Sequence, residues 1–268
     1  MDWDAAYSNS DHVAGSAEFV PRWSEASRIF REAKGPRARI GISYGPSARQ
    51  CLDLFMPEGD PRGLAIFVHG GYWHRNVRDI TSHLATGTLA HGWAFAVPGY
   101  DLCPQVRVSE ITGQIRAAIA KAAELVPGPI HLAGHSAGGH LVTRMACQDA
   151  NLPDDVTQRL GRIAPISGVH DLRPLMQTSM NDTLHLDLTE ASAESPALAM
   201  PRDGVDMLCW VGGAELPEFL RQNALLSNIW RGFGARMAAH EAPGKHHFSV
   251  IEDLEDPDSL LVRTWLKG

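Results

Sequence analysis

The sequence predicts an α/β fold, organised as one domain over residues 1–268 with a mostly parallel sheet of about eight strands flanked by helices. Three observations support this prediction. Apolar runs of strand length alternate with helix-like runs along most of the chain. The run 64–68 is apolar throughout, as in strands that are covered on both faces. Around Gly134, an apolar run, a glycine-rich turn and a helix-like run follow each other directly.

Residues 1–36 precede the first predicted strand and are expected to form an N-terminal helical arm. The segment 23–32 has a helical pattern, which Gly35 and Pro36 end. The arm also carries four aromatic residues that need a surface to pack on: Trp3, Tyr7, Phe19 and Trp23. Either the arm docks on the main domain, or it covers part of the mouth of an active site. We favour docking and expect an open mouth.

Eight segments have the length and pattern of strands. The first two alternate polar and apolar residues and are joined by the turn Gly45-Pro46, which predicts an antiparallel start. The later ones alternate with helices, which is typical of a parallel sheet. The predicted strands are 39–44, 51–55, 64–68, 93–97, 130–133, 162–167, 206–211 and 236–241.

The helical segments between these strands have recognisable beginnings and ends. The clearest is 108–125, in which apolar residues recur every three or four positions until Pro127 and Gly128 stop the helix. Another opens with Pro217 near its first turn, where a proline is tolerated. The predicted helices are 80–90, 108–125, 140–146, 216–230 and 258–266.

Residues 167–205 show only weak regular patterning. A stretch this long inside a compact domain is usually a lid or a binding insertion. Five of its residues could supply an apolar lining: Met176, Met180, Leu184, Leu186 and Leu198. We therefore expect a cap or lid in this insertion.

Gly134-His-Ser-Ala-Gly138 has the pattern G-x-S-x-G between a strand and a helix, which indicates a nucleophile elbow. A serine on so tight a turn adopts strained backbone angles, and the flanking glycines leave the room that the turn needs. A plain glycine-rich turn would explain the five residues alone, but not their context. Ser136 is therefore the candidate nucleophile.

A serine hydroxyl is a poor nucleophile unless a base and an orienting acid activate it. In folds with such an elbow, both follow later strands, the acid before the histidine. Glu215 is the first carboxylate after the strand 206–211, and Asp171 is the alternative acid. After the strand 236–241, either His246 or His247 could reach Ser136, and their spacing alone does not separate them.

The oxyanion hole is expected at the end of the buried strand 64–68, where the chain continues as His69-Gly-Gly-Tyr-Trp73. Gly70 and Gly71 let backbone N–H groups turn into the site, and the N–H of Ala137 joins them. Tyr72 and Trp73 follow at once; they either shape a pocket for an aromatic substrate or pack the loop.

Composition narrows the class of partner. The chain has 44% hydrophobic and 21% charged residues and a net charge of −7, without the clustered Lys and Arg that nucleic acids or anionic membranes require. Its 13 histidines lack metal-ligand spacing, and no apolar run is long enough to span a membrane. The acidic N-terminus has no signal-peptide pattern. We expect a cytoplasmic protein with a small-molecule substrate and with no metal, cofactor, nucleic acid or membrane partner; a homodimer is left open.

The chain resembles α/β-hydrolase serine esterases of the kynurenine formamidase (arylformamidase) branch. The resemblance covers most of the chain from Tyr44 onward, and its most specific marks are His69-Gly-Gly-Tyr-Trp73 and Gly134-His-Ser-Ala-Gly-Gly139. Many related esterases have a third glycine where this chain has Tyr72. Weaker support comes from Ile166-Ser-Gly-Val-His-Asp-Leu-Arg-Pro-Leu175, Pro217-Glu-Phe-Leu-Arg-Gln222 and His247-Phe248.

This resemblance implies Ser136 as nucleophile, His247 as base and Glu215 as acid, although the family more often has aspartate at the acid position. It also implies hydrolysis of the N-formyl group of N-formyl-kynurenine to kynurenine and formate. Members of the branch cleave simple aryl and acyl esters as well, so a general carboxylesterase is the alternative. A non-catalytic binding protein of the same fold is the alternative from another class.

Overall fold

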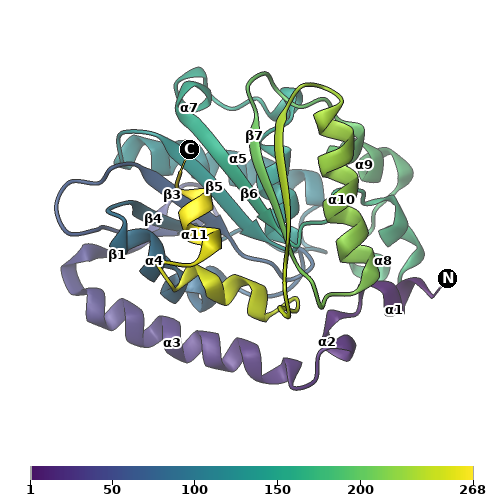
Figure 1. Ribbon diagram of the computed structural model, residues 1–268, viewed down its shortest axis with the longest axis horizontal. Helices are drawn as coiled ribbons and strands as arrows, with labels where there is room; N and C mark the ends of the chain where they lie inside the picture. The colour runs from purple at the N-terminus through teal and green to yellow at the C-terminus, as the bar shows by residue number, and fades with distance from the viewer. Residues whose placement is uncertain (1, 268) are drawn as a thin grey trace.

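The eight predicted strands join into one sheet in the order β1-β2-β4-β3-β5-β6-β7-β8, in a computed structural model that describes residues 2–267 (Figure 1). β1 pairs with β2 and β2 with β4 in antiparallel fashion, while all the other pairs are parallel. The predicted antiparallel start of a mostly parallel sheet is thus confirmed. The strands are β1 (Ala38–Ser43), β2 (Cys51–Phe55), β3 (Leu64–Val68), β4 (Ala94–Pro98), β5 (Ile130–His135), β6 (Leu160–Ile166), β7 (Asp206–Gly212) and β8 (Arg236–Ala242).

Helices cover both faces of this sheet (Figure 1). Successive side chains of a strand point to opposite faces, so Leu64 and Ile66 of β3 join one core cluster, whereas Ala65 and Phe67 join another. The first cluster includes side chains of α5 (Val108–Leu125), α6 (Ala137–Arg144) and α10 (Pro217–Arg231). The second includes side chains of α3 (Phe19–Lys34), α4 (Ala85–Ala90) and α11 (Leu260–Trp265). β3 and its neighbours are therefore buried on both faces, as the apolar runs predicted.

The N-terminal arm packs along the edge of the molecule (Figure 1). It consists of α1 (Trp3–Tyr7), α2 (Asn9–His12) and the long helix α3. α3 begins at Phe19, earlier than the helical pattern from Trp23 suggested. Pro21 is compatible with this earlier start, because it lies in the first turn, where the N–H that proline lacks has no helical partner in any case.

The segment 167–205 contains only short helices and turns. It holds α8 (Asn181–Leu184) and α9 (Leu188–Ala193), flanked by 3₁₀ turns at Arg173–Gln177 and Pro196–Leu198. Glu194, just after α9, accepts a hydrogen bond from Thr112 of α5 (2.6 Å) and lies 3.4 Å from the Arg144 guanidinium of α6. These contacts fasten the segment to helices on one face of the sheet. The remaining helix, α7 (Asp154–Arg159), precedes β6.

No helix within residues 2–267 combines the length and the apolar character that a membrane crossing needs.

Candidate active site

Ser136 lies between β5 and α6 with φ 56° and ψ −118°, a backbone conformation that residues with side chains rarely adopt. The glycines around it are sterically required. A Cβ on Gly134 would lie 2.2 Å from the carbonyl oxygen of Gly138, and one on Gly138 would lie 2.0 Å from that of Val68. The sequence G-x-S-x-G therefore folds into the strained turn that it predicts, and this turn presents the serine at the start of a helix.

Glu215 and His247 form a buried acid–base pair on the loops that follow β7 and β8. Glu215 Oε2 lies 2.6 Å from His247 Nδ1, and the Glu215 side chain is fully buried. Its other oxygen accepts hydrogen bonds from the N–H of Gly212 (2.9 Å) and from the Ser167 hydroxyl. A carboxylate at Nδ1 fixes the ring orientation and leaves Nε2 as the nitrogen that can act on a substrate.

The two alternative residues point elsewhere. Both oxygens of Asp171 bind Arg173, with the shortest ion-pair distance at 2.9 Å. His246 Nδ1 accepts hydrogen bonds from the backbone N–H groups of Phe248 and Ser249, both at 3.2 Å. The structure therefore brings Glu215, and not Asp171, to a histidine, and that histidine is His247.

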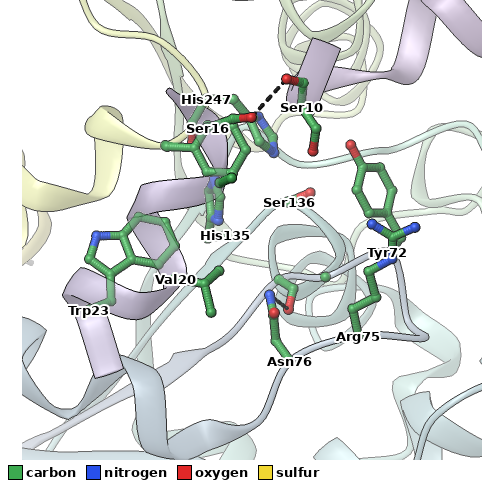
Figure 2. Close-up of a pocket in the computed structure, with 14 residues that line it drawn as sticks. Ser10, Ser16, Val20, Trp23, Tyr72, Arg75, Asn76, His135, Ser136 and His247 are labelled. Atoms are coloured by element: carbon green, nitrogen blue, oxygen red, sulfur yellow. Dashed lines mark hydrogen bonds between the residues drawn. The ribbon is translucent and has the colours of Figure 1, made fainter. Parts of the chain in front are cut away.

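Ser136 and His247 line the same cavity, which has a volume of about 260 Å³ (Figure 2). No hydrogen bond joins the Ser136 hydroxyl to His247 among the contacts of residues 2–267. Contacts of this kind are often long in the absence of substrate and tighten when it binds. The geometry thus places the hydroxyl and the imidazole at one cavity without a preformed bond between them.

The loop after β3 closes over the elbow. A Cβ on Gly70 would lie 2.7 Å from the carbonyl oxygen of His135 and 3.0 Å from the Ser136 Cβ, so only glycine permits this approach. Gly71 has φ 123°, again in the region that favours glycine. Within residues 2–267, no hydrogen bond uses the amide N–H of Gly71 or of Ala137, the first residue of α6. These amides are available to a developing negative charge beside Ser136.

Tyr72 and Trp73 have different environments, although both were candidate substrate contacts. Tyr72 lines the cavity, and its hydroxyl donates to the backbone oxygen of Tyr7 (2.9 Å) in the arm. Trp73 is only 1% exposed and does not line the cavity. Its indole N–H donates to His140 Nδ1 (3.2 Å) in the core beneath the loop. Of the two alternatives for Trp73, the structure supports packing of the loop by its large apolar ring and not a substrate contact.

The arm docks on the main domain and also lines the cavity. The mouth of the active site is therefore less open than we expected. The arm contributes five lining residues, namely Ser10, Ser16, Ala17, Val20 and Trp23. Phe19 stacks on Phe248, directly after His247, with ring centroids 5.2 Å apart. No residue of 167–205 lines this cavity; four of them line a neighbouring one together with Tyr72. The cover over Ser136 thus comes from the arm.

Two further residues support the pair, and sequence reasoning missed both. His135 Nε2 donates to the backbone oxygen of His247 (2.8 Å), and burial lowers the pKa of His135 well below its usual value, which keeps the ring neutral. Ser167 has φ 51° and directs its hydroxyl onto Glu215. Neither has a sequence signal beyond its place next to the nucleophile or at the end of a strand.

A metal-ligand cluster is not found: no group of three or more His, Cys, Asp or Glu side chains in residues 2–267 is arranged to hold an ion. The chemistry that the site can perform with its own residues is acyl transfer through a serine.

Comparison with known proteins agrees with this geometry. A family model described as the alpha/beta hydrolase family matches residues 65–265. A curated relative from Danio rerio named kynurenine formamidase is 26% identical over 274 residues, which cover 99% of this chain and 92% of the relative. The Drosophila melanogaster protein of the same name is 27% identical over 242 residues, covering 83% of this chain and 78% of the relative.

Solved structures are similar as well. A protein from Silicibacter sp. TM1040, provisionally named a thioesterase, is 48% identical and covers 99% of both chains with a TM-score of 0.95. A thermostable carboxylesterase from a metagenomic library is 19% identical, with a TM-score of 0.70 over 94% of this chain and 98% of that one, and shares the fold. Since the family model spans well over half of the sequence and includes the elbow, the chain belongs to the alpha/beta hydrolase family.

Proposed function

We propose that this protein is a serine hydrolase whose main substrates are aryl formamides such as N-formyl-kynurenine, with Ser136 as nucleophile, His247 as base and Glu215 as orienting acid. The observation that carries the proposal is the buried Glu215–His247 pair beside a serine with the backbone angles of a nucleophile elbow. The curated relatives named kynurenine formamidase, similar over nearly the whole chain, support the substrate class.

The proposed reaction proceeds in two halves. The Ser136 hydroxyl attacks the formyl carbon while His247 Nε2 takes its proton, and the amides of Gly70, Gly71 and Ala137 stabilise the oxyanion. The imidazolium, stabilised by Glu215, then donates that proton to the leaving amine, which leaves a formyl ester on Ser136. Water, deprotonated by His247, attacks this ester; the ester bond breaks, the serine regains a proton, and formate departs.

A specific observation favours a second candidate, an esterase or thioesterase. The solved protein that is 48% identical to this chain is provisionally named a thioesterase, and the same serine mechanism cleaves oxygen esters and thioesters. The two candidates differ in the group that leaves, not in the acyl-enzyme chemistry.

Steady-state kinetics on three substrates tests the proposal: N-formyl-kynurenine, p-nitrophenyl acetate and an acetyl thioester. We expect the largest kcat/KM for N-formyl-kynurenine, with release of one formate per turnover. Negligible formate release beside rapid ester or thioester hydrolysis would reject the formamidase proposal in favour of the second candidate.

A further inference from the structure

The cavity above Ser136 has two chemically different sides. Val20 and Trp23 lie on one side of Ser136, where Phe248 packs against Trp23 and completes an apolar wall, whereas Tyr72 and Arg75 lie on the other side (Figure 2). Among the residues of 2–267 that line this cavity, Arg75 is the only Arg, Lys, Asp or Glu. A full positive charge therefore stands at the edge of a cavity in a protein whose net charge is −7.

The Arg75 guanidinium has unused hydrogen-bond donors. Its Nε donates to His74 Nε2 (2.9 Å), while no hydrogen bond among residues 2–267 uses its two terminal nitrogens. No carboxylate of residues 2–267 lies within 4.0 Å of the Arg75 guanidinium. Nearby Arg78, in contrast, pairs with Asp53 at 3.0 Å. Burial, and then the charge of Arg75, lower the pKa of His74, so this histidine stays a neutral acceptor.

The backbone of Arg75 belongs to the loop after β3, residues 69–76, which we call the oxyanion loop. Its N–H donates to the carbonyl oxygen of Gly71 (2.8 Å), and the next residue, Asn76, has φ 71° and donates from its side chain to the carbonyl oxygen of Gly70 (3.3 Å). These bonds fix where the arginine leaves the loop relative to Ser136. The side chain extends beside Tyr72 at the cavity (Figure 2).

A second cavity adjoins the first and shares Ser10, Tyr72 and Arg75 with it. It also contains acidic side chains, but these have partners. Asp4 accepts from the backbone N–H (2.7 Å) and the hydroxyl (2.9 Å) of Ser179, and Asp11 accepts from Ser8 (2.5 Å). The third, Asp2, caps the first helix through the N–H of Ala5 (3.0 Å). Arg75 is thus the charged group at the junction of the two cavities, and its terminal nitrogens are free to donate.

We propose that Arg75 binds a carboxylate of the substrate, so that the enzyme selects aryl formamides and aryl esters whose leaving group carries an anionic side chain. A guanidinium with both terminal nitrogens free can bind a carboxylate through two parallel hydrogen bonds. The apolar wall takes the aromatic ring at the same time. This inference rests on the proposed function for the role of Ser136 and specifies its substrate class.

Two matched substrate pairs test the carboxylate separately from the rest of the molecule. The formamide pair is 4-(2-formamidophenyl)-4-oxobutanoate and its primary amide; the ester pair is 4-acetoxyphenylacetate and its primary amide. The measured quantity is the ratio of kcat/KM for the acid to that for the amide. For the wild type we expect a ratio of about 10 or more, the usual size of a charge-assisted hydrogen-bond effect.

Arg75→Gln should bring this ratio close to one, and Arg75→Lys should restore part of it, because lysine keeps the charge without the planar fork. Arg39→Gln is the control, since Arg39 is exposed on β1 and its substitution changes the net charge equally. Thermal melting checks that each variant is folded.

A wild-type ratio near one, or a ratio that survives Arg75→Gln, would overturn the inference. The ester pair keeps this outcome separate from the proposed function. If the enzyme cleaves no formamide but shows an Arg75-dependent ratio on the esters, the formamidase proposal fails and the carboxylate site stands.

Discussion

Every oxygen of Glu215 has a partner, although the family that the chain resembles more often has the shorter aspartate here. One oxygen binds His247, and the other accepts from Gly212 and Ser167. The side chain of glutamate is one methylene longer than that of aspartate. The hydrogen bonds from Ser167, after β6, and Gly212, at the end of β7, hold the Glu215 carboxylate in its extended position. The sequence already favoured Glu215 by position; the structure adds the reason that the longer acid fits.

Glu215→Gln should lower kcat by about 10³-fold or more, because the amide no longer stabilises the imidazolium and leaves the histidine tautomer undefined. Asp171→Asn is the matched control and should stay within a few-fold of wild type, since Asp171 pairs with Arg173. Steady-state hydrolysis of an aryl ester measures both. Retained activity in the glutamine variant together with a large loss in the asparagine variant would show that the acid is Asp171.

Ser167→Gly isolates the hydroxyl that binds Glu215. Glycine accepts φ 51° without strain, so the variant should fold, but it lacks the donor to the carboxylate. We expect kcat to fall by about 10-fold, as for a lost hydrogen bond to a charged group, with KM nearly constant. Asn151→Gly, also at φ 51° but exposed and outside the lining of the Ser136 cavity, is the control. An unchanged kcat in the Ser167 variant would show that the hydroxyl does not support Glu215 and that the serine only forms the turn.

Among the elements of the fold, the N-terminal arm and the oxyanion loop are joined by a hydrogen bond. Tyr72 donates to the backbone of Tyr7, whose own hydroxyl donates to Glu218 at the start of α10 (2.7 Å). α1 therefore connects the loop that shapes the cavity to a helix on the sheet. Burial, and then the hydrogen bond to Glu218, raise the pKa of Tyr7, so its hydroxyl stays a donor at all ordinary pH values.

Tyr7→Phe should loosen the arm, because it removes this hydrogen bond to a buried carboxylate, worth about 1.5–3 kcal/mol. We expect faster proteolytic cleavage before α3 and a larger change in KM than in kcat. Tyr44→Phe removes a tyrosine hydrogen bond to Gly99 and is the matched control, because Tyr44 follows β1 at one end of the sheet whereas α10 packs on β7 and β8 at the other. Equal cleavage rates in the two variants would contradict a link between Tyr7 and the cavity.

The strands, the elbow and the acid and base loops were predictable because each depends on a local pattern of a few residues. The contribution of the arm to the cavity lining and the burial of Trp73 were not predictable, for a physical reason. Stacking of Phe19 on Phe248 joins residues that lie far apart in the sequence, and no local pattern carries such a contact. The direction of Trp73 depends on positive φ at Tyr72 and Trp73, a conformation that non-glycine residues adopt only when tertiary packing enforces it.

At the scale of the whole molecule, the core contains several neutral histidines. Burial lowers the pKa of five of them to about 4 (His69, His83 and His131) or about 3 (His140 and His170). His170 is fully buried, and neither ring nitrogen has a hydrogen-bond partner among residues 2–267. In the unfolded chain these rings regain the ordinary value of 6.5, so between pH 6.5 and about 4 the unfolded state binds more protons.

Acid should therefore destabilise the fold steeply below pH 6.5. Each buried histidine contributes up to about 1.4 kcal/mol per pH unit to the free energy of unfolding, present at neutral pH and lost as the pH falls. Urea midpoints at pH 7.5, 6.0 and 5.0 measure this. His170→Met should make the dependence shallower, whereas the same change at exposed His12 should leave the slope unaltered. A flat profile between pH 7.5 and 5.0 would contradict the burial of neutral rings.

The acyl-enzyme that we propose requires the Ser136 hydroxyl, so removal of this hydroxyl should stop the hydrolysis of an aryl formamide. The most direct measurement is kcat/KM for formate release from N-formyl-kynurenine by the wild type and by Ser136→Ala, with Ser43→Ala on β1 as the control. We expect rapid release by the wild type and the control, and a loss of about 10⁴-fold or more in a folded Ser136→Ala protein. Substantial formate release by the alanine variant would contradict the proposed acyl-enzyme.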